Sequence, residues 1–463
     1  MTSAVAPPDL DAVLVGGLGS PHDDFVAASV RALGMPASTT GPFDADALDR
    51  GRRATPRGQC APAIYTTGAL LRAVGALPEG HAVAHLGVTS CGPCRYALFP
   101  DTWQRALLRE GLGPVHALGL TQDGAALAER LAGPVGWRLV DAVLAADVLS
   151  EMRRRVGPHV QDVSALDRFF DDAVRTVVAR LDAGDDAPRA LLAVHSWHRG
   201  LVREPVRARA RVAVIGDPWS MHVDGDGQMH LPRLLARAGV EVELPPVALW
   251  LAYLLWQARE APWGRAETPD AATIARVSAV EERLRARLAE LGEAVGLVQI
   301  DLPSIDELAE LAAPHLPSSL RGGYGHIEVG LAARAVRERR AHLLVSVKSF
   351  GCVPSAGVSD AILPAVLGEA LPLLVLEVSG DGEAARESRL AMHLAAAQEH
   401  ACAELEAARI NAHWTVRRVE RLPPSEPLDG KFLVGARDFA CTRACEVALA
   451  SREHPLHLVE TGD

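Results

Sequence analysis

Three segments of the sequence carry cysteines beside glycine or proline. Cys60 precedes a proline by two positions, Cys91 and Cys94 form a Cys-x-x-Cys pair around Gly-Pro, and Cys352 directly follows a glycine. A thiolate that binds a metal needs a fixed turn and backbone N–H groups near its sulfur, and glycine and proline provide such turns. These residue types therefore predict a metal or redox site built from thiolates.

A thioredoxin-like redox pair and a zinc site would each need a pattern that these cysteines do not form. A thioredoxin-like pair would place Cys-x-x-Cys at a helix start after an early strand, and zinc would usually need a second such pair or two histidines. The sequence has no second Cys-x-x-Cys pair and lacks the rest of the thioredoxin pattern. Any one segment alone could simply be a loop with a small apolar residue, but three such segments in one chain favour a shared site.

The remaining cysteines give weaker signals. Cys402 lies in an alanine-rich helical segment, so we expect it to be buried. Cys441 and Cys445 stand four positions apart on a predicted last helix, where they could chelate a metal or pack against neighbouring residues. Disulfides are not expected in the reducing compartment that the rest of the sequence indicates.

The predicted elements place two of the three cysteine segments directly after strands. Cys91 and Cys94 follow a strand that ends at Val88, and Cys352 follows a strand that ends at Val347. Parallel α/β sheets bind ligands in the loops at the carboxyl ends of their strands. Cys60 stands just before a predicted helix, from which it could project toward the same cleft.

The order of the elements indicates an α/β fold with two or more Rossmann-like, doubly wound domains. Short apolar runs predict strands at residues 12–15, 82–88, 115–120, 211–217, 240–244, 342–347 and 373–378. We expect an N-terminal α/β domain at 1–136, a helical connection at 137–207, a second α/β domain at 208–384, and C-terminal helices with a return strand at 385–463. The glycines at 16–19 lack the spacing of a dinucleotide fingerprint and predict a tight turn.

The composition argues against several classes of protein. Hydrophobic residues make up 49% and charged residues 23% of the 463 positions, as in globular proteins. A formal charge of -11 and the absence of a basic stripe argue against nucleic-acid binding. No apolar run reaches the ~18 residues of a membrane span, and the first residues do not resemble a signal peptide, so we expect no membrane association and a cytoplasmic location.

Four motifs together resemble a known superfamily. They are Arg57-Gly58-Gln59-Cys60-Ala61-Pro62, Gly92-Pro93-Cys94-Arg95-Tyr96, the segment from Phe350 to Asp360, and Glu377-Val378-Ser379-Gly380-Asp381-Gly382-Glu383. They are similar to motifs of the 2-hydroxyacyl-CoA dehydratase and benzoyl-CoA-reductase-type superfamily. The branch they resemble most is associated with CoA-enzyme activases and includes double-cubane-cluster proteins.

The resemblance implies a [4Fe–4S] or a double-cubane [8Fe–9S] cluster in a cleft between stacked α/β domains. Cys60, Cys94 and Cys352 match the cluster cysteines of the superfamily, and Cys91 is either a fourth ligand or a bystander. In the resembling dehydratases, a low-potential electron reduces a CoA thioester to a ketyl radical that expels hydroxide. Since no Gly-x4-Gly-Lys-Ser/Thr loop occurs, a separate ATP-dependent activator would supply the electron. We also expect the protein to act as a homo- or heterodimer.

Further roles at the expected site fall mainly to neighbours of the cysteines. The residues expected to handle protons are Ser90 and Ser359, with His195, His198 and His222 as further candidates. The residues expected to line the cluster are Gly92, Arg95 and Gly351, of which Arg95 could stabilise a thiolate or attract an anion.

Two other functions stay open at this point. One is a double-cubane reductase of small molecules, and the other is a non-catalytic iron–sulfur subunit that transfers electrons or serves as a scaffold. Three thiolates on a cubane would leave one iron without a protein ligand, and an open iron can bind a substrate oxygen. An exchangeable iron would therefore favour catalysis over electron carriage.

Overall fold

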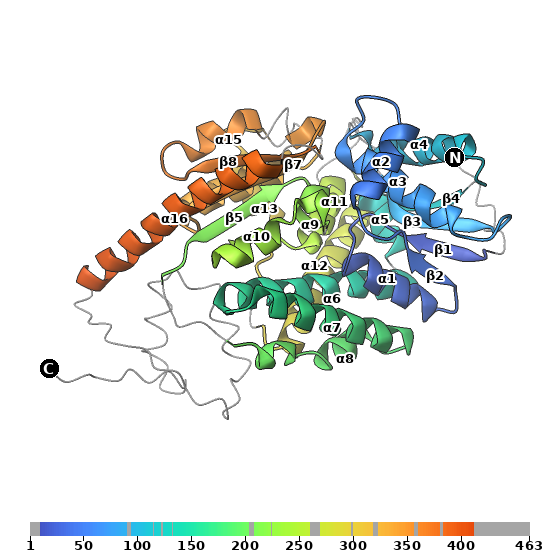
Figure 1. The fold of residues 1–463 in the computed structure, drawn as a ribbon, viewed down its shortest axis with the longest axis horizontal. Coiled ribbons are helices and arrows are strands. Elements are labelled where there is room, and N and C mark those ends of the chain that lie inside the picture. Colours follow the sequence, from blue (N-terminus) through green and yellow to red (C-terminus); the bar gives the residue numbers. More distant parts are fainter. Residues whose placement is uncertain are drawn as a thin grey trace.

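The computed structural model describes residues 10–89, 94–113, 115–121, 124–131, 133–202, 208–223, 225–259, 269–297, 300–317, 323–355, 360–379 and 383–411. Within these ranges the chain forms two four-stranded parallel sheets surrounded by helices (Figure 1). The α/β fold class is thereby confirmed, and the sheets are compatible with Rossmann-like domains.

The first sheet has the strand order β2-β1-β3-β4. Its strands are β1 (Ala12–Val15), β2 (Ala37–Thr39), β3 (Val83–Thr89) and β4 (Val115–Thr121). The helices in this part of the chain are α1 (His22–Arg31), α2 (Ala45–Ala54), α3 (Ala61–Gly75), α4 (Phe99–Arg109) and α5 (Gly124–Arg130), with the short 3-10 helix η1 (Arg95–Leu98) before α4. The strand order reverses between β1 and β3, and such a switch point is where α/β sheets bind ligands.

The second sheet repeats this arrangement with the order β6-β5-β7-β8. Its strands are β5 (Arg211–Gly216), β6 (Glu241–Glu243), β7 (Leu343–Ser349) and β8 (Leu373–Val378). All seven residues of β7 are buried, as expected for a strand covered on both faces. β7 therefore holds the place in the second sheet that β3 holds in the first, and a candidate cysteine segment follows each of them.

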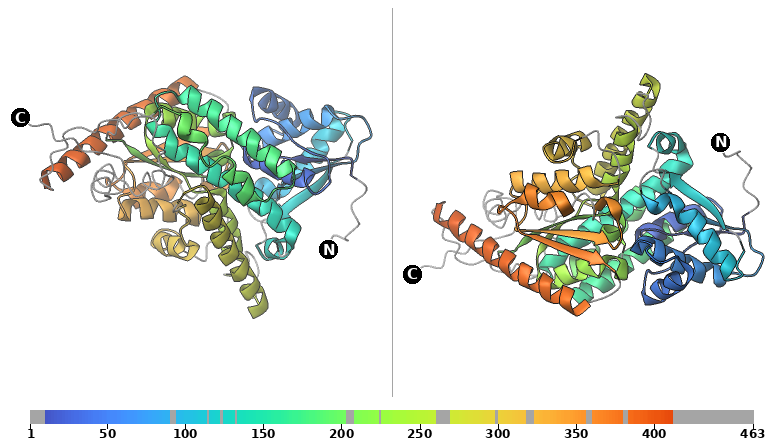
Figure 2. Two further views of the ribbon diagram at one scale, coloured as in Figure 1. Left: turned by 90° about the horizontal axis from the view of Figure 1, so that it is seen from below. Right: turned by 90° about the horizontal axis from the view of Figure 1, so that it is seen from above.

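Helices occupy the chain between and after the sheets. They are α6 (Pro134–Val156), α7 (Val163–Asp182), α8 (Ala187–Leu192), α9 (Pro218–His222), α10 (Leu231–Ala238), α11 (Val247–Arg259), α12 (Ala271–Ala294), α13 (Ile305–Ala312), α14 (Gly325–Arg337), α15 (Asp360–Leu367) and α16 (Glu383–Asn411), with the 3-10 helices η2 (Gly157–His159), η3 (Trp197–Gly200) and η4 (Asp226–Gln228). In Figure 1, α6, α7 and α8 lie below the two sheets, and Figure 2 shows α16 along one side of the second sheet.

The core joins the two sheets through α11, whose sequence is apolar on nearly every side. A helix of this kind is stable only when it is surrounded, and α11 packs against α5, α6 and α12. Asp147 on α6 fixes its start, because the carboxylate accepts hydrogen bonds from the backbone N–H groups of Val247 and Ala248 over 2.8 Å and 3.0 Å. The same carboxylate contacts Nε2 of His22 on α1 over 3.1 Å. One buried aspartate thus ties three helices together.

Two glycines allow the backbones of α2 and α3 to touch, which sets the position of Cys60. A Cβ atom on Gly51 would lie 1.8 Å from the carbonyl oxygen of Ile64, and one on Gly68 would lie 1.7 Å from that of Ala47. Only glycine fits such an approach. The start of α3 is therefore fixed against α2.

Some predictions concern residues outside the described ranges, and one prediction needs correction. The predicted return strand at 414–419, the last helix at 436–450, and Cys441 and Cys445 with it, lie outside the described residues. Cys402 does lie on a helix, α16, but its side chain is exposed, so the prediction that it is buried is wrong. It lies on the solvent side of a helix whose buried stripe includes the preceding Ala401. Among the described helices none is long and apolar enough to cross a membrane.

Candidate functional site

The loop after β7 meets the start of α3, so residues from the two sheets lie in contact. The backbone N–H of Ala61 donates a hydrogen bond to the carbonyl oxygen of Phe350 over 3.1 Å. A Cβ atom placed on Gly351 would lie 3.5 Å from Cα of Cys60. Cys60 and the segment that carries Cys352, almost three hundred positions apart in the sequence, are therefore neighbours.

Helix geometry suits Cys60 and Cys94 for thiolate chemistry. Cys60 is the N-cap of α3, a proline stands in the first turn of that helix, and only 8% of the cysteine is exposed. Cys94 is the N-cap of η1, which leads into α4. The N-terminus of a helix carries partial positive charge and backbone N–H groups, both of which stabilise a nearby thiolate.

A tight turn brings Cys352 back toward the strand that precedes it. Gly351 has a φ of +73°, in the left-handed region that favours glycine. The backbone N–H of Cys352 then donates to the carbonyl oxygen of Ser349 over 3.0 Å. Gly351 was expected to line the cluster, and in the structure it forms the turn between β7 and Cys352 and lies against Cys60.

Tyr96, two residues after Cys94, has a pKa that its surroundings raise. Burial raises its pKa most, and the charges of Cys94, Cys60, Asp217 and Asp23 raise it further, in that order. The tyrosine ring stacks on Phe99 of α4 with 4.2 Å between centroids. The pKa of Tyr96 therefore responds to charged groups from both halves of the chain.

Cys352 lies beside a buried hydrogen-bond network. The Ser355 hydroxyl donates to Oε1 of Glu328 over 2.6 Å, and both residues are almost fully buried. Burial raises the pKa of the Cys352 thiol, as does the charge of Asp217, while hydrogen bonds from the N–H and side chain of Ser355 act in the opposite direction. Without a metal the thiol therefore stays protonated at neutral pH, and a bound cation would reverse that preference.

Two carboxylates that the sequence analysis missed fix the loops around this region. Asp217, directly after β5, accepts hydrogen bonds from the backbone N–H of Ser349 over 2.6 Å and of Ser220 over 3.0 Å. Burial raises its pKa above the ordinary value. The only sequence signal was its place after a strand that ends in glycine.

Asp23 holds the loop after β1 in the corresponding place of the first sheet. Its carboxylate accepts hydrogen bonds from the N–H groups of Gly17, Leu18 and Gly19 over 3.1, 3.2 and 2.6 Å. Burial raises its pKa to about 6. Because the chain's own carboxylate takes these N–H groups, the structure favours the tight turn over a phosphate-binding loop.

The other predicted site residues are either remote from the cysteines or not described. Ser90, Cys91, Gly92 and Ser359 lie outside the described residues, and so does the side chain of Arg95. None of the three histidines lies in a cysteine segment. His195 and His198 follow α8, where Nδ1 of His195 contacts the carbonyl oxygen of Leu192 over 2.7 Å. His222 ends α9, and burial lowers its pKa to about 3.

The thiols of the candidate site are of the kind that iron–sulfur clusters require as ligands. Among the described residues, no three His, Cys, Asp or Glu side chains come close enough to hold one metal ion. A cubane offers a separate iron to each thiolate, so its ligands do not converge on one point. The structure brings the segments of Cys60 and Cys352 into contact, and it places Cys94 at the start of η1. No protein-family model matches the chain, and a comparison with curated proteins finds no match.

Proposed function

We propose that the protein is an iron–sulfur protein of the 2-hydroxyacyl-CoA dehydratase type, in which Cys60, Cys94 and Cys352 hold a [4Fe–4S] cluster. The reaction would be reductive elimination of water from a CoA thioester. The electron would come from a separate ATP-dependent activator, and the chain would act as a dimer.

The observation that carries the proposal is the contact between the start of α3 and the loop after β7. The hydrogen bond from Ala61 to Phe350 brings together two segments whose motifs resemble the cluster-binding motifs of the superfamily. The carboxyl ends of β3 and β7, the corresponding strands of two sheets with the same order, lead into the other ligand segments. This is the arrangement that a cluster bridging two sheets would need.

Residues around the proposed cluster would adjust its potential and bind the substrate. A cluster held by Cys60, Cys94 and Cys352 would supply low-potential electrons and could bind a substrate oxygen. The Ser355 N–H donates to the Cys352 sulfur, and the Ser355 hydroxyl, which bonds Glu328 in the structure, can turn to that sulfur when Cys352 is a thiolate. Such hydrogen bonds raise the potential of a cluster. Tyr96 lies beside Cys94 and Cys60 and keeps its proton, because burial and nearby negative charges raise its pKa. It can therefore donate a hydrogen bond to a substrate oxygen near the cluster.

Electron paramagnetic resonance of the anaerobically reconstituted and reduced protein tests the proposal. The cluster signal should change when a 2-hydroxyacyl-CoA thioester is added, and the same concentration of CoA alone should leave it unchanged. A signal that responds to neither compound would favour an electron carrier, and eight irons per chain would favour a double-cubane reductase. A colourless zinc protein would refute every cluster function.

A further inference from the structure

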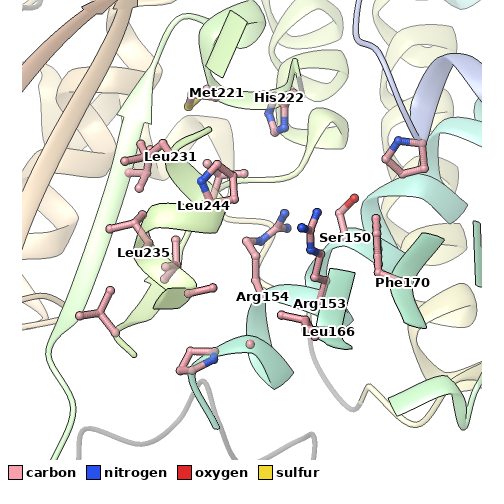
Figure 3. A pocket seen from close by; sticks show the side chains of 18 of the residues that line it. Ser150, Arg153, Arg154, Leu166, Phe170, Met221, His222, Leu231, Leu235 and Leu244 are labelled. Carbon is pink, nitrogen blue, oxygen red and sulfur yellow. The ribbon is translucent and has the colours of Figure 1, made fainter. Parts of the chain in front are cut away.

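A cavity of about 80 Å³, lined by none of the cysteines, lies between the starts of α1 and η2, the helices α6, α7, α9 and α10, and the strands β5 and β6 (Figure 3). One wall is apolar. Its side chains are those of Val214, Met221, Leu231, Leu235, Val240 and Leu244. The opposite wall carries Arg153, Arg154, Ser150 and Phe170, and Figure 3 shows the two guanidinium groups next to each other between the walls.

Arg153 is held in place but keeps donors for another partner. Its guanidinium lies 4.6 Å from the ring centroid of Phe170, and its Nη2 donates to Asp167. Asp167 also contacts Nε of Arg233 over 3.0 Å, so one carboxylate is shared by two arginines. Nε and Nη1 of Arg153 make no hydrogen bond to any residue in the described ranges. A guanidinium with N–H groups at a cavity wall is suited to a carboxylate.

A buried histidine in the same cavity also has an unused polar atom. His22 lines the cavity and is 3% exposed. Its Nε2 faces Asp147, which also accepts from two backbone N–H groups, so Nε2 donates in this contact. Nδ1 is buried and has no hydrogen-bond partner among the described residues. Unsatisfied buried atoms are rare in native proteins; since Nε2 carries the proton in this contact, Nδ1 can accept a hydrogen bond, and an ordered water in the cavity would satisfy it.

The second histidine of the cavity adds no positive charge. His222 lies 6.2 Å from His22 between ring centroids, and burial lowers its pKa to about 3, so it is neutral at pH 7. The charge available to a ligand is therefore that of Arg153, because Arg154 pairs with Glu151 over 3.0 Å. The volume leaves room for a few water molecules or a small organic ion.

We propose that this cavity binds a small aliphatic carboxylate, with its carboxylate on Arg153 and its tail against the apolar wall that includes Leu235 and Leu244. Neither the cluster nor the proposed reaction is needed for this binding. Its site is separate from the loops that carry Cys60 and Cys352.

Thermal unfolding and calorimetry of the full chain with propionate, propionamide and phosphate test the proposal. Propionate should raise the unfolding midpoint in a saturable way, while the uncharged propionamide should not. Phosphate, an anion without a tail, should bind at least tenfold more weakly, because it cannot use the apolar wall.

Two arginine substitutions provide a matched pair. Arg153→Met should weaken propionate binding at least tenfold, because it removes the anchoring guanidinium while Arg233 still pairs with Asp167. Arg233→Met removes the other ion pair of Asp167 and the same charge, but Arg233 does not line the cavity. This control should bind propionate as the wild type does.

A second pair changes the volume of the cavity without changing its charge. Ala236→Leu on α10 adds bulk at the cavity wall and should abolish binding, while Ala238→Leu, at an exposed position of the same helix, should not. Equal binding of propionate and propionamide would overturn the proposal. So would an unchanged affinity in Arg153→Met, or the absence of propionate binding to the wild type.

Discussion

The backbone N–H of Ala61 donates to the carbonyl oxygen of Phe350 over 3.1 Å. This bond joins the first turn of α3 to the residue that follows β7, and it places Cys60 beside Gly351. A second link between the two halves runs from Nη2 of Arg52 to the carbonyl oxygen of Ser379, over 3.0 Å. The ends of β7 and β8 are thus both attached to α2 and α3, the helices that position Cys60.

Ser355→Ala should lower the reduction potential of the cluster. The substitution removes a hydroxyl next to the Cys352 sulfur, whose single proton goes to Glu328 in the structure and can turn to the sulfur when Cys352 is a thiolate. Loss of a hydrogen bond worth about 1 kcal/mol corresponds to about 40 mV for one electron. An anaerobic redox titration followed by electron paramagnetic resonance measures the shift. Ser346→Ala is the control, because this buried hydroxyl on β7 has no partner among the described residues; equal potentials in both variants would contradict the assignment.

Gly351→Ala should impair cluster binding more than it impairs folding. A non-glycine residue at a φ of +73° costs about 1–2 kcal/mol, and relaxing that strain would move Cys352. Gly184→Ala imposes a similar strain, at a φ of +93°, in the turn between α7 and α8. Both variants should lose similar unfolding free energy in urea. Only Gly351→Ala should bind less iron at limiting iron, and equal iron contents would refute the role of this turn.

Asp147→Ala should destabilise the protein strongly. It removes the partner of His22 and of two N–H groups at the start of α11, all of them buried. Breaking a buried charged network typically costs roughly 3–5 kcal/mol. Asp162→Ala removes a half-exposed N-cap that bonds Ser164 over 2.8 Å, and it should cost only about 1 kcal/mol. Urea unfolding measures both, and losses of equal size would show that Asp147 does not tie the helices together.

His85 should make the protein less stable in acid. The ring packs against Trp103 with 4.5 Å between centroids, and burial lowers its pKa from 6.5 to about 4. The unfolded chain therefore binds a proton that the folded chain does not. The stability that His85 contributes is complete above pH 6.5 and is lost as the pH falls from 6.5 toward 4.

His85→Phe should remove this part of the acid sensitivity. The wild type should lose roughly 2–3 kcal/mol more unfolding free energy than the variant between pH 7 and pH 4.5, since each unit of pKa shift is worth about 1.4 kcal/mol. His315→Phe changes an exposed histidine and should keep the wild-type dependence. If His85→Phe has the same pH dependence as the wild type, His85 is not kept neutral by burial.

All described strands except β2 could be predicted from the sequence, because short runs rich in apolar residues mark them. The predicted run at 373–378 is β8, and those at 82–88 and 342–347 differ from β3 and β7 by one or two residues at each end. β2 is three residues long and polar at one end, and it was missed because its stability comes from pairing with β1. The apolar helix α11 has no amphipathic period, so its sequence carries no helical pattern to recognise.

Of the residues in the candidate site, only the cysteines could be predicted from the sequence. Their glycine and proline neighbours give a local signal, and the structure brings the segments of Cys60 and Cys352 together. Asp23 and Asp217 gave no such signal, because their role depends on N–H groups that only the folded loops present. His195 was a candidate by residue type alone, and the fold places it after α8.

The central claim is that Cys60, Cys94 and Cys352 hold one cluster, and iron and acid-labile sulfide in anaerobically reconstituted protein test it most directly. Cys60→Ala, Cys94→Ala and Cys352→Ala should each lose most of the iron and sulfide and the broad thiolate-to-iron absorbance. Cys402→Ala changes an exposed cysteine on α16 and should keep the wild-type content. Wild-type iron and sulfide in the Cys60 and Cys352 variants would contradict the account.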